Sequence, residues 1–458
     1  MPTPIPKPPG VPLLGNIFDI DPSNTWGSLK KLADKYGPIF KINALGTQIV
    51  FVGSASLLEE ICDQTRFRKC VTGPVVEIRA LVHDALFTAY DSEPMWGIAH
   101  RIMAPLLTPA AVQTNFEEMR DTIAELVTKW MESGSKQRVN VLNDLQRLDL
   151  QTNMLCMYGQ QVNYLEGPEP VMIKAMHDST MEAMKRPTRP KLLNRLLYQG
   201  VFDKNNKIMR DFAAGILAYR KENPTSRNDL LNALINGKDP ETEKSLNESQ
   251  IIDEIVTLFI GSSTSPCLMS FATYYLINNP KEITKAREEI ESIVGLGGQL
   301  ELSHLSRLPY CEAILRESLR LSAAAPGFNI EPLPTTTTTT IQLAGGKYEI
   351  PKNQVMIAVL SAVNRDPDVF DDPLAFKPER MLSEAYEKLP ASVKKGFGNG
   401  KRECVGKNFA WQWSFVTLVS IIRSVDLAMA DPAYQLAMDG AFNMEMQGFF
   451  ALAGPRAG

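Results

Sequence analysis

A single cysteine lies among glycines in the stretch from Gly396 to Gly406, which reads GFGNGKRECVG. Glycine permits positive φ angles and lets the backbone approach a flat group closely. Cys404 precedes a helical pattern and follows Lys401 and Arg402, and a helix N-terminus with nearby cations favours the thiolate form. A thiolate that accepts backbone N–H groups suits a redox-tuned iron ligand. The alternative is a buried structural cysteine next to a turn.

The same stretch resembles the haem-binding signature of the cytochromes P450, Phe-x-x-Gly-x-Arg-x-Cys-x-Gly, at every fixed position. This long spacing makes the structural alternative the weaker one. The resemblance implies that Cys404 is the axial ligand of the iron of haem b. It also implies that Arg402 pairs with a haem propionate and that Phe397 packs on the thiolate side, with Gly398 beside it. The fold implied is that of the cytochromes P450, mainly α with a minor β part.

Two further motifs of the family occur in the expected order. Glu317 and Arg320 form its Glu-x-x-Arg, and residues three apart share a helix face and can pair. Such pairs are also common on solvated helices. Arg380, in the sequence FKPER, would complete the buried Glu-Arg-Arg network that the resemblance implies, since guanidinium groups can bind carboxylates in a bidentate manner.

Trp96 and His100 are further candidates for contact with the haem. The family usually has Trp-x-x-x-Arg here, and both side chains reach propionates. This chain has His100 at the arginine position and Arg101 one residue later. By resemblance, His100 is therefore the propionate candidate, although a lone histidine is more often a surface or core residue.

The longest helical pattern contains the range 261–267, which reads GSSTSPC. Thr264 matches the oxygen-side threonine of the family, whereas Ser263 stands where the family has Asp or Glu. Oxygen activation needs an alcohol and a proton source, so both residues are candidate catalytic groups. Either serine hydroxyls order a water chain that replaces the acid, or the reaction depends less on proton delivery. Pro266 predicts a kink in this helix because it removes a backbone hydrogen bond.

The resemblance covers nearly the whole chain and favours one branch of the family, the soluble self-sufficient fatty-acid hydroxylases of bacteria and fungi. In that branch the haem domain is fused to a flavin reductase. This chain stops at Gly458 without an FMN, FAD or NADPH motif. We expect residues 1–458 to form a single haem-thiolate monooxygenase domain, cut from a fusion or standing alone. FMN, FAD and NADPH would act through a fused or separate reductase that docks over a basic cluster, Lys394, Lys395, Lys401 and Arg101.

Several apolar residues resemble positions that line the pocket of the fatty-acid hydroxylases, as expected for an apolar substrate: Phe87, Ala325, Phe328, Phe442 and Met444. Core packing explains the last two equally well. The Arg and Tyr that hold a fatty-acid carboxylate in this branch are replaced by Thr47 and Phe51. We therefore expect an NADPH-dependent monooxygenase that hydroxylates or epoxidises a secondary metabolite, such as a polyketide or terpenoid. Fatty-acid hydroxylation, a non-hydroxylating reaction (rearrangement, desaturation or peroxide use) and a haem sensor remain alternatives.

Mostly helical elements are predicted to position these residues. Helical spacing runs through most of the range 54–280 and ends with a long pattern from Asn247 to Asn279. Asn247 and Gln250 resemble a capping box, and Pro280 marks the stop. Further helices are expected at 25–36, 279–294, 310–321 and from beyond Cys404 to about 423. Strands are expected at 39–44, 48–52, 335–343, 348–350 and 355–360.

Composition excludes several classes of protein. The 458 residues are 44% hydrophobic and 22% charged, with a net charge of −4 and no dense tract of Lys and Arg, so no nucleic-acid partner is expected. The six cysteines are scattered without a CxxC pair, which argues against disulfides and zinc and favours a reducing, cytoplasmic location. The proline-rich N-terminus has no apolar run of membrane length, so we expect a soluble chain without a membrane span.

Overall fold

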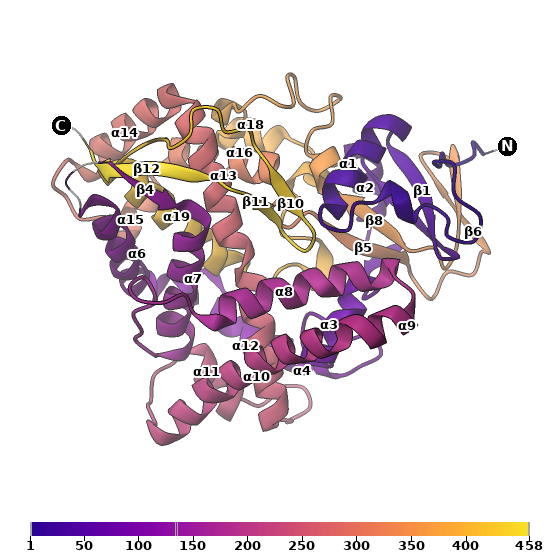
Figure 1. Ribbon diagram of the computed structural model, residues 1–458, viewed down its shortest axis with the longest axis horizontal. Helices are drawn as coiled ribbons and strands as arrows, with labels where there is room; N and C mark the ends of the chain where they lie inside the picture. The colour runs from indigo at the N-terminus through magenta and orange to yellow at the C-terminus, as the bar shows by residue number, and fades with distance from the viewer. Residues whose placement is uncertain (1, 133, 135, 457–458) are drawn as a thin grey trace.

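Helices make up most of the structure, a computed structural model, and a smaller β part lies at one end (Figure 1). The structure describes residues 2–132, 134 and 136–456. The α-helices are α1 Thr25–Tyr36, α2 Ala55–Ile61, α3 Pro74–Val82, α4 Met95–Met103, α5 Pro109–Gln113, α6 Phe116–Met131, α7 Val141–Tyr158, α8 Val171–Lys185, α9 Lys191–Leu193, α10 Gln199–Glu222, α11 Leu230–Asn236, α12 Glu248–Ser262, α13 Thr264–Asn278, α14 Pro280–Val294, α15 Leu302–Leu305, α16 Pro309–Ser322, α17 Leu360–Val363, α18 Ser383–Lys388 and α19 Lys407–Ser424. The prediction of a mainly helical chain with a minor β part is confirmed.

The strands form small sheets. The largest has the order β1-β2-β8-β5-β3, with β1 Ile39–Ala44, β2 Thr47–Val52, β8 Met356–Val359, β5 Gly327–Pro332 and β3 Phe67–Lys69. The others are β4-β12-β9 (Gln137–Asn140, Phe450–Pro455, Val425–Met429), the pair β10 Met438–Gly440 and β11 Met444–Met446, and the pair β6 Thr340–Leu343 and β7 Tyr348–Pro351. Short 3-10 helices include η5 Pro378–Met381 and η7 Gly400–Arg402.

Some predicted elements differ from the structure. β3 and β4 lie inside the range that the periodicity assigned to helix, because each is a short strand that pairs with a distant segment, β5 and β12 respectively. The strand expected at 335–343 forms only over Thr340–Leu343, where it pairs with β7. Neither error could be corrected from local pattern, because strand pairing is a tertiary contact.

The long central helix begins as predicted and then breaks. The side chains of Asn247 and Gln250 form the capping box at the start of α12. The α-helix ends at Ser262 and a new one starts at Thr264, so Pro266 lies in the first turn of α13. Backbone N–H groups in a first turn have no helical partner, so proline costs little there. The helix is therefore interrupted at one residue, Ser263, which keeps dihedral angles in the α-helical region and lies three residues before Pro266.

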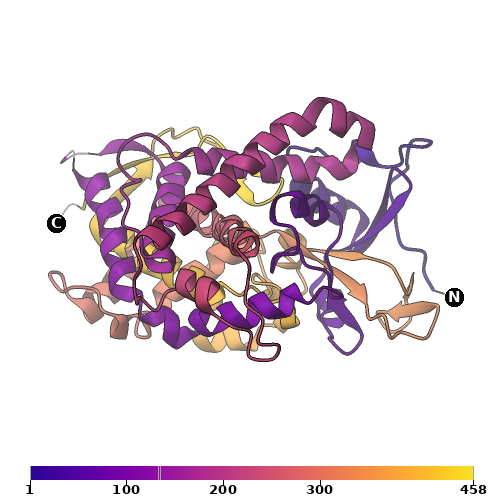
Figure 2. The ribbon, with the colours of Figure 1, turned by 90° about the horizontal axis from the view of Figure 1, so that it is seen from below.

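The run α12–α13 is also the core of the helical part. Figure 2 shows it surrounded by other helices. Among the described residues, this is the stretch long and apolar enough to cross a membrane by length and composition, but 78% of the apolar window is buried inside the fold. Burial of this kind is typical of a core helix.

Candidate active site

Cys404 lies in a loop of glycines between η7 and α19. Gly398 and Gly400 have φ angles of +87° and +65°, which side chains rarely adopt. A Cβ added at Gly398 would lie 2.8 Å from the Nζ atom of Lys69. The backbone N–H of Cys404 donates to the carbonyl oxygen of Phe397 at 2.8 Å. The glycines therefore let the loop fold back tightly around the cysteine.

The thiol of Cys404 keeps accessible surface although it lies deep in the protein. Burial raises its pKa, while the backbone N–H of Gly406 and the ammonium group of Lys69 act in the opposite direction. Lys401 and Arg402, which were predicted to provide the positive field at the sulfur, both bind Asp91, and the cations whose charge lowers the pKa of the thiol include Lys69 of β3 and Lys407.

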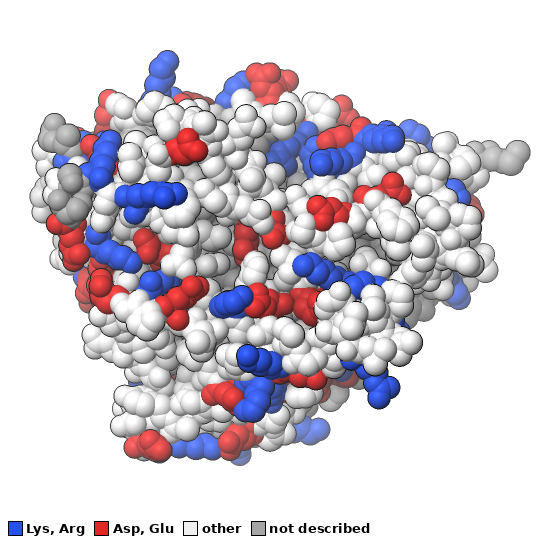
Figure 3. Space-filling model, in the orientation of Figure 1, with Lys and Arg blue, Asp and Glu red and all other residues white. Residues whose placement is uncertain are grey.

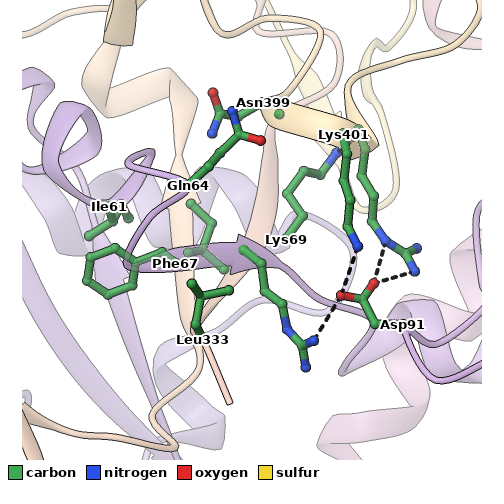
Figure 4. Close-up of a pocket in the computed structure, with 12 residues that line it drawn as sticks. Ile61, Gln64, Phe67, Lys69, Asp91, Leu333, Asn399 and Lys401 are labelled. Atoms are coloured by element: carbon green, nitrogen blue, oxygen red, sulfur yellow. Dashed lines mark hydrogen bonds and ion pairs between the residues drawn. The ribbon is translucent and has the colours of Figure 1, made fainter. Parts of the chain in front are cut away.

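A basic cavity of about 180 Å³ adjoins the loop (Figure 4). Asp91 is an ion-pair partner of Arg402 at 2.8 Å, Arg68 at 2.9 Å and Lys401 at 3.4 Å. Lys69 also lines the cavity, and burial lowers the pKa of its ammonium group to about 8. Arg68 also pairs with Glu331 at 2.6 Å, so the three cations Lys69, Lys401 and Arg402 remain against the single carboxylate of Asp91 among the residues that line the cavity. This excess of positive charge suits a ligand that carries carboxylates.

Two predicted haem contacts, Trp96 and His100, stack on α4 with ring centroids 5.1 Å apart. Lys401 and Arg402 lie over the Trp96 ring, 5.3 and 5.4 Å from its centroid. Burial, and then the charge of Arg101, lower the pKa of His100. The structure therefore gathers Trp96, His100 and Arg402, from α4 and η7, beside the cysteine loop.

The motif residues Glu317 and Arg320 pair inside the protein. Glu317 is 0% exposed and accepts two hydrogen bonds of 2.7 Å from the Arg320 guanidinium. The Nε atom of Arg380 lies 3.5 Å from the same carboxylate, which also accepts the backbone N–H of Lys377. Arg320 donates further to backbone carbonyls of Asn364, Pro373 and Ala375. The network ties α16 to the chain segment that leads toward the cysteine loop.

The break between α12 and α13 exposes Gly261 and part of Thr264, although most neighbouring residues of these helices are buried. The hydroxyl of Thr264 donates to the carbonyl of Gly261 at 3.0 Å. Ser263 is buried; its hydroxyl donates to the carbonyl of Ile260 and accepts from the amide of Asn443, both at 2.7 Å. Thr264 is thus partly accessible at the opening, whereas the Ser263 hydroxyl is occupied by bonds that join the helix to the segment after β10.

The predicted pocket residues differ in setting. Phe87 is 41% exposed and meets the edge of the Phe442 ring at a centroid distance of 6.3 Å. Phe328, on β5, and Ala325 are half-buried. Met444 is 3% exposed and belongs to the main hydrophobic core. Core packing, the alternative considered for Met444, is what its burial favours.

Sequence reasoning missed three residues of this region: Lys69, Asp91 and Asn443. Each acts through a partner far away in the chain; Asn443 and Ser263, for instance, are 180 residues apart. The sequence gave one indication of Asp91: the cationic side chains of Lys401 and Arg402 need a nearby anion.

Comparison with known proteins identifies the family. The chain matches the description "Cytochrome P450" over residues 5–440, and it belongs to this family. Similar proteins include the bifunctional cytochrome P450/NADPH–P450 reductase ascE of Acremonium egyptiacum, 38% identical over 455 residues, which are 97% of this chain and 43% of the relative. The self-sufficient cytochrome P450 monooxygenase CYP505E5 of Aspergillus niger is 39% identical over 451 residues, 97% of this chain and 42% of the relative. The chain thus spans about two-fifths of the length of the curated relatives it matches. The resemblance to the reductase-fused branch and the cytochrome P450 fold are confirmed.

Proteins of this family bind haem, and the residues present fit it. Cys404 keeps accessible surface in a loop of glycines, so its sulfur is available as an iron ligand. The cation excess at Lys69 and Arg402 matches the propionates, with His100 close by. Cys404 would hold the iron and these side chains the carboxylates. When bound, haem supplies the activation of O₂.

Proposed function

We propose that this chain is the haem-carrying part of a monooxygenase that inserts one oxygen atom into a sizeable apolar secondary metabolite, such as a polyketide or terpenoid. The overall reaction is RH + O₂ + NADPH + H⁺ → ROH + H₂O + NADP⁺. Electrons would pass from NADPH through the FMN and FAD of a fused or separate reductase. The names of the relatives, a bifunctional P450/NADPH–P450 reductase among them, support this electron source. The location expected from the cysteine usage is the cytoplasm.

The observation that carries the substrate class is the composition of β2. Thr47 is exposed and pairs across the strands with Ala44. Phe51 is 3% exposed and stacks on its partner Phe40 with ring centroids 5.1 Å apart. Neither position nor its cross-strand neighbour offers a cation or a phenol. A fatty-acid carboxylate would find no partner at either position, which favours an uncharged apolar molecule.

At the oxygen side we propose Thr264 as the alcohol that positions O₂-derived oxygen and water, because its hydroxyl is partly accessible where the helix opens. The other candidate catalytic residue is Ser263, and its hydroxyl mainly connects the helix break to the side chain of Asn443. Phe87 and Phe328 would contact the substrate, since both keep exposed ring surface.

For the reductase we propose docking over Lys394, Lys395 and Lys401. Arg101, the fourth member of the expected cluster, is bound by Asp239 at 2.8 Å and by Glu241 at 2.9 Å, so its charge is largely neutralised. On the face shown in Figure 3, Lys and Arg are interspersed with Asp and Glu, and wide areas between them carry no charge. Such mixing offers no field of one sign for a nucleic acid.

The test is turnover of the haem-loaded protein with an NADPH–P450 reductase and isotopically labelled O₂. A panel would contain polyketides, terpenoids and palmitate, first ranked by the spectral change that marks displacement of water from the haem. One labelled oxygen atom in a product from an uncharged apolar compound supports the proposal. Binding and hydroxylation of palmitate in preference to the others would overturn the substrate class.

A second candidate is a haem-thiolate catalyst that does not hydroxylate, because Ser263 replaces the expected acid and its hydroxyl is already occupied. Product formation with peroxide that equals product formation with NADPH and reductase would favour this reaction type.

A further inference from the structure

Two consecutive acids of α12 hold the segment between α3 and α4. The backbone N–H of Leu86 donates to the Oε1 atom of Glu254 at 3.0 Å. The Nδ1 atom of His83 lies 3.0 Å from the carboxyl group of Asp253. Glu254 is 1% exposed and Asp253 is 3% exposed. These contacts join residues 168 and 170 positions apart in the chain, so they fix where the segment lies against the central helix.

The conformation of this segment depends on such support. His83 follows the last residue of α3 and has a φ angle of +48°, which residues other than glycine rarely adopt. Residues in this region persist where surrounding contacts hold them. The hydroxyl of Thr88 donates to the carbonyl of His83 at 2.8 Å, and the backbone N–H of Thr88 donates to the carbonyl of Ala85 at 2.9 Å. Phe87 therefore lies inside a tight turn whose position follows those of His83 and Leu86.

Phe87 is connected to the helix break through the segment after β10. Its ring is 41% exposed and contacts Phe442 with ring centroids 6.3 Å apart. The residue after Phe442 is Asn443, whose amide donates to the hydroxyl of Ser263 at 2.7 Å. A displacement of the turn would therefore move the Phe87 ring relative to this segment and to the partly accessible Thr264.

The carboxyl group of Glu254 is half used. Its Oε1 atom accepts the N–H of Leu86, whereas its Oε2 atom is buried and has no hydrogen-bond partner among the residues that the structure describes. Burial of a polar group without a partner is costly, and an apolar side chain would fill this place at a lower cost. A costly acid beside a segment that carries a candidate substrate contact indicates a role in placing that segment.

We propose that Glu254, assisted by Asp253, positions Phe87 and thereby determines which carbon of the substrate lies beside Thr264. This inference rests on the proposed monooxygenase function. Glu254 is a positioning residue, because it acts through the backbone of Leu86 and not by contact with the substrate. Removal of its acceptor oxygen should therefore change the shape of the pocket beside Phe87.

Ligand binding tests this role without turnover. Imidazole and 4-phenylimidazole both bind the haem iron, but only the second extends a ring into the pocket. In spectral titrations of the haem-loaded protein, the ratio of their dissociation constants should change about tenfold in Glu254→Leu, which lacks the acceptor of a buried hydrogen bond. Glu254→Gln should keep the wild-type ratio. Burial raises the pKa of Glu254 to about 8, so a neutral amide reproduces the protonated acid and still offers an acceptor.

The matched control is Glu289→Leu, the same substitution in another pair of helices. Glu289, on α14, accepts the backbone N–H groups of Tyr310 and Cys311, on α16, at 2.7 and 2.9 Å. This variant should keep the wild-type ratio of dissociation constants. An unchanged ratio in Glu254→Leu, or an equal change in Glu289→Leu, would overturn the proposal.

The other anchor of the segment gives a second variant. The side chain of His83 is 56% exposed, so His83→Ala should fold, and the ratio should change in the same direction by about twofold. If Glu254→Leu yields no folded protein, an unchanged ratio in His83→Ala would overturn the proposal.

Product distribution tests the consequence for the reaction. Limonene serves as the terpenoid of the panel, because it is uncharged and has several oxidisable positions. The ratio of its products should shift about tenfold in Glu254→Leu and stay unchanged in Glu254→Gln and Glu289→Leu. A changed binding ratio with an unchanged product ratio would overturn the role in regiochemistry. Absence of product from the wild type with every compound of the panel would instead contradict the proposed function, while the imidazole titrations would still decide whether Glu254 positions Phe87.

Discussion

Replacing Glu317 by Gln tests the buried network behind the cysteine loop. The Glu317 and Arg320 side chains are 0% and 2% exposed, so the change leaves a buried guanidinium without its counter-ion. Breaking such a pair costs about 3–5 kcal/mol of unfolding free energy. With an unfolding entropy of about 2.1 cal/mol/K per residue, a chain of 458 residues changes by about 1 kcal/mol per degree. We therefore expect Tm to fall by about 3–5 °C.

The same helix supplies a matched control. Glu312 binds Arg316 at 2.8 Å in a pair whose side chains are 29% and 18% exposed. Glu312→Gln should lower stability by only about 0.3–0.5 kcal/mol, because water screens and replaces this pair. The assay is thermal unfolding of both variants, together with the haem content of the purified protein. Equal losses in Glu317→Gln and Glu312→Gln would refute the reasoning that burial makes the first pair critical.

Three further changes test other parts of the structure. Ser263→Ala should lower the unfolding free energy by about 1–3 kcal/mol in denaturant titrations, because the buried amide of Asn443 loses its acceptor; an unchanged midpoint would contradict this. Burial raises the pKa of Glu254 to about 8, so the native state keeps a proton that the unfolded state releases. Wild-type stability should therefore fall as the pH rises from about 5 to 8, and the advantage of Glu254→Gln should widen over this range; parallel stability curves would contradict it. Thr47→Arg should improve palmitate binding by up to about 1 kcal/mol in spectral titrations, since Thr47 is exposed and the new ion pair is screened; no gain would show that the carboxylate does not pass this strand.

The sequence was sufficient where the physics is local. The capping box at Asn247 and Gln250 depends on residues three apart, and the structure contains it. The pairing of Glu317 with Arg320 follows from the same helical spacing. The tight loop around Cys404 could be predicted because its glycines adopt backbone conformations that few other residues adopt.

The sequence was insufficient where a contact joins distant segments. Asp91 holds Arg402 from 311 residues away, and Lys69 reaches the loop from a strand that the helical pattern concealed. The sequence did not place the interruption of the central helix at Ser263, three residues before Pro266.

The axial ligand is the central claim, and one spectrum tests it most directly. The reduced carbon-monoxide complex of the haem-loaded wild type should absorb at the position typical of thiolate ligation. Cys62→Ser and Cys70→Ser, at half-buried cysteines whose thiol pKa is raised by burial, should keep this absorption. Cys404→Ser should lose it. A thiolate-type spectrum that survives in Cys404→Ser would contradict the assignment of the haem ligand.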